Sequence, residues 1–454
     1  MRAEKNYSFI IIFLGALFFI GVFYHINSSE FWPVTISKTW FTPPNFEFSM
    51  LQKPLFTFFL SLFHILPLSD ISHLYLVKCF FSLLGVVGIF LYFESNRDSN
   101  KNLSGIFLFV LLSPLYMQNF FRIRSDQIGF FMFALMLFLI SRKRIKGALL
   151  ILFLIPFFGV KEILFWIPGL TILAPHLKPK WKNFTLRIKL FFVGIMMASL
   201  VWLIALNISS IYYLAETFSH KMVLGLHLRT YLMLEWPLIL SVLIVNWVTF
   251  QKEDKMGRAF IWASLASLVL IVGLPQSYPF YIASLCFIIY LPLIRFIQTK
   301  LHFKKVKIAL GFLVLLQLLN IGLFTDRENF PLYVSNRSEF LFIKSASQIL
   351  ATHHLSYLDG MGMFPKQKFI PCFVSPDDAD SNLNCLRQIK NSAAESIVVT
   401  QRRMFLGEEI FKQLDQHYDQ LKPNFWIIKN KFSQIPPSEI DLANGPIPIF
   451  TFGF

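Results

Sequence analysis

Charged residues that could bind a phosphate or move a proton interrupt the apolar runs of this sequence. In the stretch "FFRIRSDQIGFFMF", Arg122, Arg124 and Asp126 stand between two runs of hydrophobic residues. Two arginines so close together could bind an anion such as a phosphate through bidentate hydrogen bonds. The Asp126 carboxylate could act as a general base, or it could cap the next helix, because serine and aspartate are favoured N-cap residues.

Other polar groups of the same kind lie in short segments between apolar runs. They are Glu30 in "SSEFWP", Lys53 in "QKPLF", Lys161 and Glu162 in "GVKEILFW", His220 in "FSHKM", and Tyr278 and Tyr281 in "LPQSYPFYIASL". Each also has a structural interpretation. Lysines and arginines at helix ends can extend to lipid headgroups, adjacent opposite charges can pair with each other, and tyrosines favour the membrane interface. A lone histidine such as His220 is more often structural than catalytic. Glu47, after "TPPNF", is a weaker candidate for the catalytic carboxylate.

The composition predicts a polytopic membrane protein. Of 454 residues, 55% are hydrophobic and only 15% are charged, and the mean hydropathy is +0.57. The net charge of +16 could indicate nucleic-acid binding, but the lysines and arginines cluster in short loops between apolar runs, as membrane topology requires. The four cysteines lack CxxC or Cys/His spacing, and no acidic cluster has metal-ligand spacing. We therefore expect no metal, no cofactor and no nucleic-acid partner.

The apolar runs predict about eleven transmembrane helices. The N-terminal run has a basic start but no small-x-small cleavage site after it, which predicts a retained first helix. Ten further spans are predicted from runs long enough to cross a bilayer or nearly so. They cover residues 71–93, 103–118, 128–140, 147–158, 163–175, 190–212, 230–250, 259–274, 280–297 and 308–324.

The apolar run Pro54–Leu68 decides on which side of the membrane each loop lies. If it does not cross, the dense basic loops around Arg142–Lys146, Lys178–Lys189, Lys252–Arg258 and Lys300–Lys307 all lie on the same side as the basic N-terminus. Cytoplasmic loops carry such an excess of lysine and arginine. The run is also only fifteen residues long, with a proline near each end. We therefore interpret it as a juxtamembrane helix on the outer face of the membrane, and expect a cytoplasmic N-terminus.

This topology divides the chain into a transmembrane domain, residues 1–324, and an outer tail, residues 325–454. The first outer loop covers residues 25–70. The tail has ordinary soluble composition and predicts a small extracytoplasmic α/β domain. Its predicted helices cover residues 338–354, 382–391 and 405–421, and its predicted strands 355–359, 396–400 and 425–429. Cys372 and Cys385 would lie in an oxidising compartment there and could form a disulfide.

Several of these features occur in an order that resembles a known family. An acidic residue near the start of the first outer loop is followed by "QKPLFTFFLSLF", "RSDQIGFF", "GVKEILFWIPGL" and "LPQSYPFYIASL". Over about Tyr7–Phe324 this order resembles the polyprenyl-phosphate-dependent glycosyltransferases of GT-C fold, closest to the aminoarabinose transferase and protein mannosyltransferase group. The resemblance implies inverting transfer of a sugar from a polyprenyl-phosphate donor to lipid A, another glycan or a protein, at the outer face of the inner membrane.

The resemblance also implies roles for the candidate residues. Lys53, at the family's Lys–Pro position, would hold the donor phosphate, and Arg122 and Arg124 could form a second clamp. The family usually has Asp–Glu at the start of the first loop, whereas this chain has Ser29–Glu30. The catalytic base could therefore be Glu30 or Asp126. The remaining substrate-binding candidates are Lys161, Glu162, His220, Tyr278 and Tyr281.

Two other function classes stay open. A transporter or flippase for a lipid-linked sugar would also carry charges near a cavity, but transporters tend to have inverted repeats and charges near the membrane midplane. In this sequence the candidate charges gather at one predicted face and no repeat is visible, which favours the enzyme. A non-catalytic scaffold is the third class, because of the departure at Ser29.

Overall fold

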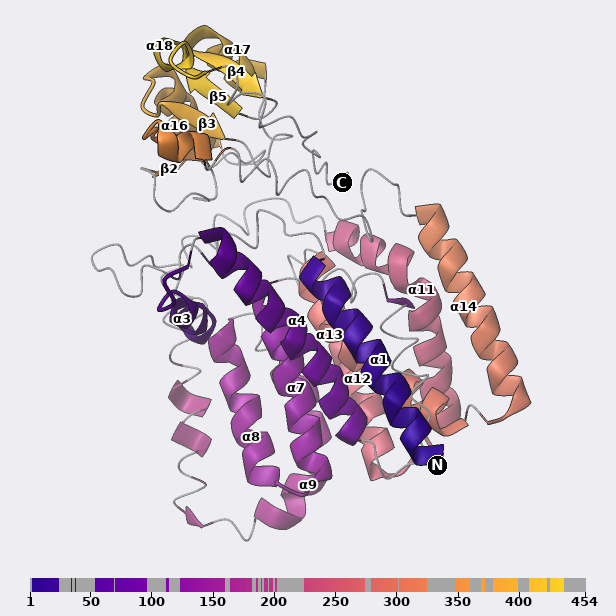
Figure 1. Cartoon of the computed structure of the whole chain (residues 1–454). Coiled ribbons are helices and arrows are strands. Elements are labelled where there is room, and N and C mark those ends of the chain that lie inside the picture. Colours follow the sequence, from indigo (N-terminus) through magenta and orange to yellow (C-terminus); the bar gives the residue numbers. More distant parts are fainter. Residues whose placement is uncertain are drawn as a thin grey trace. The chain divides into compact units, whose positions relative to one another are not determined.

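The structure is a computed structural model that is mainly helical, as predicted (Figure 1). It describes residues 2–23, 34, 37, 54–68, 70–95, 112–113, 123–159, 164–181, 185–186, 189, 192–194, 196–198, 201, 224–273, 279–300, 302–324, 346, 348–359, 369–371, 379–398, 408–422 and 425–436. The chain divides into two compact units. The first contains Met1–Val22, Phe48–Phe59 and Leu76–Asp326, and the second contains Phe23–Glu47, Leu60–Tyr75 and Arg327–Phe454.

Long helices build the first unit, and each follows one of the apolar runs. The helices are α1 (Arg2–Phe23), α3 (Pro54–Phe63), α4 (Asp70–Ser95), α7 (Ser125–Ser141), α8 (Ile145–Leu154) with the short helix η3 (Ile155–Phe158), α9 (Trp166–Trp181), α11 (Leu224–Thr249), α12 (Lys255–Gly273), α13 (Pro279–Lys300) and α14 (Lys304–Phe324). Helices α3 and α4 each contribute residues to both units. The predicted spans 103–118 and 190–212 lie largely outside the described residues, and every other predicted span overlaps a helix.

Aromatic and aliphatic side chains form the interior of this bundle. Helix α12 packs against α9 and α13, and α11 packs against α13 and α14. The ring of Phe287 on α13 meets Tyr92 of α4 and Phe130 of α7 edge-on, with centroids 4.9 and 4.8 Å apart. A Cβ placed on Gly88 of α4 would lie 2.7 Å from the Phe130 ring. Helices α4, α7 and α13 therefore meet closely at Phe287 and Gly88.

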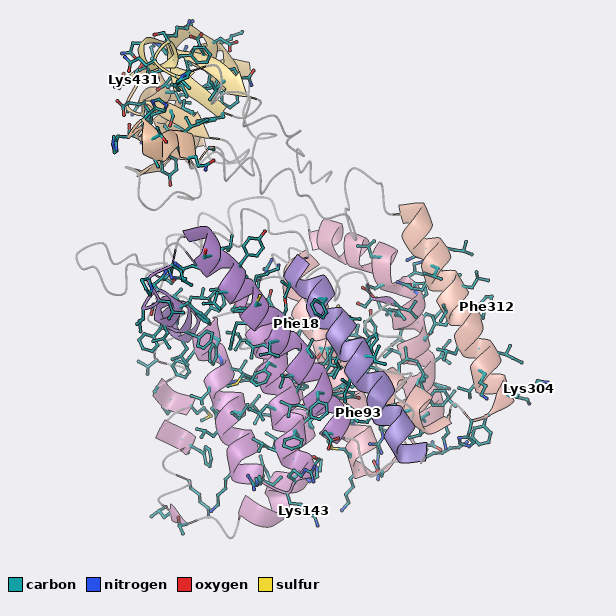
Figure 2. All side chains as sticks on the ribbon, viewed as in Figure 1. Phe18, Phe93, Lys143, Lys304, Phe312 and Lys431 are labelled. Atoms are coloured by element: carbon teal, nitrogen blue, oxygen red, sulfur yellow. The ribbon has the colours of Figure 1, made fainter. Side chains whose placement is uncertain are left out.

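Large apolar side chains also cover the outside of the bundle. Trp247, Val269, Phe312 and Ile12 are 88%, 71%, 65% and 70% exposed, and Figure 2 shows Phe312 pointing away from α14. Among the described residues, one helical segment, Ser72–Ser95, is both long and apolar enough to cross a membrane, with a mean hydropathy of 2.2. A core helix of a soluble protein would pass the same test, so the eleven crossings stay a prediction.

Ion pairs tie together the helix ends that carry the basic loops. Arg142, after α7, lies 3.5 Å from Glu94 at the end of α4. Arg295 on α13 contacts Glu253 at 3.3 Å and Asp254 at 2.9 Å, in the turn between α11 and α12. Partial burial alone would raise the pKa of Asp254. The pKa nevertheless lies below its ordinary value, because the Gly257 N–H and Arg295 stabilise the carboxylate. Figure 2 shows Lys143 and Lys304 at this same end.

The second unit contains a five-stranded sheet with strand order β2-β1-β3-β5-β4. Its elements are β1 (Tyr357–Asp359), β2 (Phe369–Pro371), α16 (Ala379–Lys390), β3 (Ser396–Val398), α17 (Glu408–His417), β4 (Tyr418–Lys422), β5 (Phe425–Ile428) and α18 (Lys429–Phe432). Strand β1 pairs in parallel with β2 and β3, whereas β5 is antiparallel to β3 and β4. This arrangement has the mixed α/β character that the tail sequence predicts.

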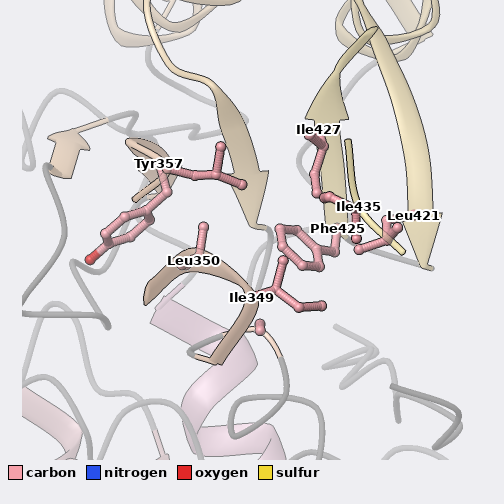
Figure 3. Close-up of a cluster of buried hydrophobic side chains, with 9 residues drawn as sticks. Ile349, Leu350, Tyr357, Leu421, Phe425, Ile427 and Ile435 are labelled. Atoms are coloured by element: carbon pink, nitrogen blue, oxygen red, sulfur yellow. The ribbon is translucent and has the colours of Figure 1, made fainter. Parts of the chain in front are cut away.

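Alternating side chains of the strands form two apolar clusters. Tyr357, Phe425 and Ile427 pack with Ile349 and Leu350 in one cluster (Figure 3). The neighbouring strand residues Leu358 and Trp426 belong to the other cluster, with residues of α16 and α17. Because successive strand side chains point to opposite faces, both faces of the sheet are covered.

Two features of the tail differ from the prediction or extend it. The predicted helix 405–421 is wrong at its C-terminal end, because α17 stops at His417 and Tyr418–Lys422 form strand β4. Pairing with β5 and a 2.8 Å hydrogen bond from the buried Tyr418 hydroxyl to the Ala394 carbonyl hold this segment extended. Cys385 is disulfide-bonded, whereas Cys79 and Cys286 form no disulfide. Cys372, its predicted partner, lies outside the described residues.

Candidate functional site

The structure describes the side chains of two predicted site residues, Asp126 and Arg124. The helix α13 includes Tyr281, but the side chain of Tyr281 is not described. The other candidates lie outside the described residues, namely Glu30, Lys53, Arg122, Lys161, Glu162, His220 and Tyr278. The convergence of the complete set therefore stays a prediction, and the described part of the candidate site is the start of α7.

Asp126 and Arg124 form a mostly buried ion pair. The Arg124 Nε donates to Asp126 Oδ2 at 2.9 Å, and the two side chains are 15% and 4% exposed. The structure does not support the interpretation of Asp126 as a helix cap. Arg124 occupies the N-cap position in an extended conformation, without a side-chain capping bond, and Asp126 lies in the first turn. The positive end of the helix dipole favours a carboxylate there.

The residues on either side of Asp126 are also polar and buried. Ser125 is 1% exposed and Gln127 is 3% exposed. Within the described part of the chain, neither Ser125 Oγ nor Gln127 Nε2 has a hydrogen-bond partner. Buried polar groups are normally hydrogen-bonded, so these two groups are available to a ligand or to water. The start of α7 thus combines a guanidinium, a carboxylate and two further hydrogen-bonding groups.

This polar group lies far from the basic end of the bundle. Helix α7 has 17 residues, a length of about 25 Å at 1.5 Å per residue. Asp126 stands in its first turn, whereas Arg142–Arg144 follow its last residue. The carboxylate and the basic loop therefore lie at opposite ends of the same helix.

A second polar cluster, centred on Glu235 of α11, was not predicted. Glu235 is fully buried and accepts hydrogen bonds from Ser113 Oγ at 2.8 Å and from the Tyr290 hydroxyl of α13 at 2.9 Å. Each carboxylate oxygen accepts one of these bonds. The sequence signal was a single carboxylate inside an apolar run, "YLMLEWPLIL". In membrane proteins such a residue is a functional candidate by default.

Side-chain amides of α14 extend this cluster. Gln317 Nε2 donates to the carbonyl oxygens of Leu112 and Leu234, both at 2.9 Å. Asn320 Nδ2 also donates to the Leu234 oxygen at 3.0 Å, and Trp236 Nε1 donates to Asn320 Oδ1 at 2.7 Å. Helices α11, α13 and α14 and the Leu112–Ser113 segment are thus connected by buried hydrogen bonds.

A buried lysine and a pair of histidines were also not predicted. Lys78 of α4 is fully buried, in the interior of a predicted span. In the second unit, His64 Nε2 lies 2.8 Å from the Val34 carbonyl oxygen, and the His64 ring meets His73 with centroids 4.8 Å apart. Across the described residues there is no group of three or more His, Cys, Asp or Glu side chains that could hold a metal ion. The contacts of the two histidines are those of structural residues.

The comparisons with known proteins do not assign a family. No family model, no curated protein and no solved structure matches this chain. The function is therefore inferred from the residues and their geometry.

Proposed function

We propose that this protein is a membrane glycosyltransferase that moves a sugar from a polyprenyl-phosphate donor to an acceptor at the outer face of the inner membrane. The observation that carries the proposal is the polar group at the start of α7. There the buried pair Arg124–Asp126 lies beside Ser125 and Gln127, and the buried atoms Ser125 Oγ and Gln127 Nε2 have no partner in the described part of the chain. The order of sequence motifs that resembles the GT-C fold supports the same function.

A membrane location is supported by the exposed apolar surface of the bundle. Side chains as large as Trp247 and Phe312 are mostly exposed on α11 and α14. Soluble monomers rarely expose large contiguous apolar surfaces, because contact with water is unfavourable. We propose that eleven helices cross the bilayer, with the basic helix ends in the cytoplasm and the second unit outside.

The proposed reaction is a single displacement at the anomeric carbon of the donor sugar. A carboxylate, Asp126 or Glu30, accepts the proton of the acceptor hydroxyl. The hydroxyl oxygen then forms a bond to the anomeric carbon, and the bond from that carbon to the phosphate oxygen breaks. Polyprenyl phosphate leaves, and Lys53, Arg122 and Arg124 stabilise its negative charge. Attack opposite the leaving group inverts the anomeric configuration.

Transfer by the reconstituted protein tests this proposal. Wild type with a labelled polyprenyl-phosphate sugar is expected to glycosylate lipid A or a glycan or protein acceptor, and Glu30→Gln, Lys53→Ala and Asp126→Asn are expected to lose transfer. Asp254→Asn is the matched control, because it removes a carboxylate that pairs with Arg295 at the other end of the bundle. Transfer that is unchanged in all three site variants would overturn the proposal.

A transporter or flippase for a lipid-linked sugar is the second candidate. The burial of Glu235 and Lys78 inside the bundle favours it, because charged groups deep in a membrane often mark transport pathways. In the same vesicles, movement of the labelled lipid to the opposite leaflet without transfer would support this function. If the vesicles show neither transfer nor movement of the lipid, the result supports the non-catalytic scaffold.

A further inference from the structure

We propose that α11 and α13 form a paired hinge whose N-terminal halves move as one body, held together by the Glu235–Tyr290 hydrogen bond. Each helix has an internal proline, Pro237 in α11 and Pro292 in α13. A proline inside a helix removes one backbone hydrogen bond and bends the helix. Glu235 and Tyr290 each stand two residues before the proline of their own helix. Their 2.9 Å hydrogen bond therefore joins the two helices on the same side of both prolines.

A separate link joins the two helices on the other side of the prolines. Arg295 follows Pro292 in α13, and it contacts Glu253 at 3.3 Å and Asp254 at 2.9 Å, just beyond the end of α11. The N-terminal halves are thus connected by one polar link and the C-terminal ends by another. The two prolines lie between these links, where bending is easiest.

The hydrogen bonds around Pro237 are those of a bend that is stable inside a bundle. The Leu234 carbonyl, three residues before the proline, accepts from both Gln317 and Asn320 of α14. Ser241 Oγ donates to the Pro237 carbonyl at 2.8 Å. Pro237 itself removes the donor to the carbonyl four residues earlier, at Met233, and side-chain bonds to the neighbouring carbonyls help to stabilise a bend here in a membrane. Figure 1 shows that the ribbon of α11 changes direction along its length.

The burial of the Glu235–Tyr290 bond explains why the two halves would move together. Both residues are fully buried, so separation of the two halves would break this hydrogen bond at a place that water does not reach, which is unfavourable. Bending at the prolines would then change the predicted outer end of the bundle and leave the basic end in place. This inference is independent of the proposed function, since a transporter could use the same hinge.

Amide hydrogen exchange of the full-length protein in lipid nanodiscs tests the hinge. Tyr290→Phe removes the phenol hydroxyl and leaves the ring. We expect exchange in peptides covering Leu224–Trp236 to become at least about tenfold faster, as the loss of a buried hydrogen bond to a charged group predicts. Ser264→Ala is the matched control, because Ser264 Oγ bonds the Ile289 carbonyl at 2.7 Å and so links α12, not α11, to α13.

Two further variants keep the test decisive. Pro237→Ala restores a backbone N–H and is expected to slow exchange in the same peptides. If Tyr290→Phe does not fold, Glu235→Gln weakens the same link by removing its charge and is expected to speed exchange about threefold. Exchange equal to wild type in the folded Tyr290 or Glu235 variant would overturn the proposal. Equal acceleration by Ser264→Ala would overturn it as well.

Discussion

Replacement of Asp126 by asparagine is expected to destabilise the protein substantially. The change keeps the shape of the side chain but leaves the Arg124 guanidinium without its charged partner at 2.9 Å. Loss of one partner from a buried ion pair costs about 3–5 kcal/mol. Because Arg124 keeps 15% of its side-chain exposure, we expect a loss near the lower end, about 3 kcal/mol.

A double-mutant cycle measures the pair itself. Arg124→Gln and Asp126→Asn are combined, and the free energy of unfolding of all four proteins is measured in mixed micelles from helical circular dichroism. The double variant removes both charges of the pair, so it is expected within about 1 kcal/mol of wild type, with a coupling energy of about 2 kcal/mol or more. The exposed pair Arg295–Asp254 is the control, where we expect less than about 1 kcal/mol. Coupling below about 0.5 kcal/mol at Arg124–Asp126 would refute a buried pair.

The same double variant separates a purely structural role of the Arg124–Asp126 pair from a chemical one. If the pair only stabilises the fold, restored stability should restore sugar transfer. We expect instead that the double variant is stable and that transfer remains lost, because the proposed site needs the charges themselves. Transfer at the wild-type rate would remove Asp126 from the site and leave Glu30 as the candidate base.

Three further predictions concern packing, ionisation and the disulfide. Gly88→Ala should destabilise the folded protein by about 1–3 kcal/mol, because its Cβ would meet the Phe130 ring. Gly15→Ala is the control and should not destabilise the protein, because a Cβ there would have nothing within 4 Å. Thermal unfolding of the two variants tests this difference. Burial raises the pKa of Tyr418 from 10 to about 12. The stability that the neutral Tyr418 hydroxyl contributes should therefore be complete below pH 10 and be lost as the pH rises towards 12. In denaturant unfolding, Tyr418→Phe should abolish this loss of stability at high pH. Cys385→Ser should lower the stability of the second unit by about 3 kcal/mol in denaturant unfolding and release the thiol of its disulfide partner for alkylation.

The sequence predicted the long helices well because their signal is local. Runs such as those of α4, α7 and α13 are mostly apolar, and each is followed by a segment that contains basic residues. The tail elements β1, α16, β3 and β5 were also predicted close to their observed positions. In each case the residues within one segment decide the conformation.

The features that the sequence did not predict depend on contacts with distant residues. Strand β4 follows α17 without a break, and it is a strand because β5 pairs with it. Strand β2 was not predicted, since three residues carry too little pattern by themselves. Asp126 was expected as a possible helix cap, but its carboxylate instead pairs with Arg124.

In the candidate site too, some residues stand out in the sequence and others are recognised only by their contacts with distant residues. Asp126 and Arg124 were identified because charges between apolar runs stand out in a sequence. Glu235 was passed over as one carboxylate in a span, and its importance appears only when Ser113 and Tyr290, far away in the chain, are found beside it. Sequence spacing alone does not predict such a cluster.

Sidedness is the property on which the proposed site depends most directly. Cys79 and Cys286 are replaced by serine, and a single cysteine is introduced by Leu68→Cys or Lys304→Cys, at positions that are exposed in the structure. Intact cells with a permeabilised outer membrane are treated with a membrane-impermeant maleimide. We expect labelling at position 68 in intact cells and at position 304 only after lysis. Labelling at position 304 but not at position 68 in intact cells would place the proposed site in the cytoplasm and contradict the proposed function.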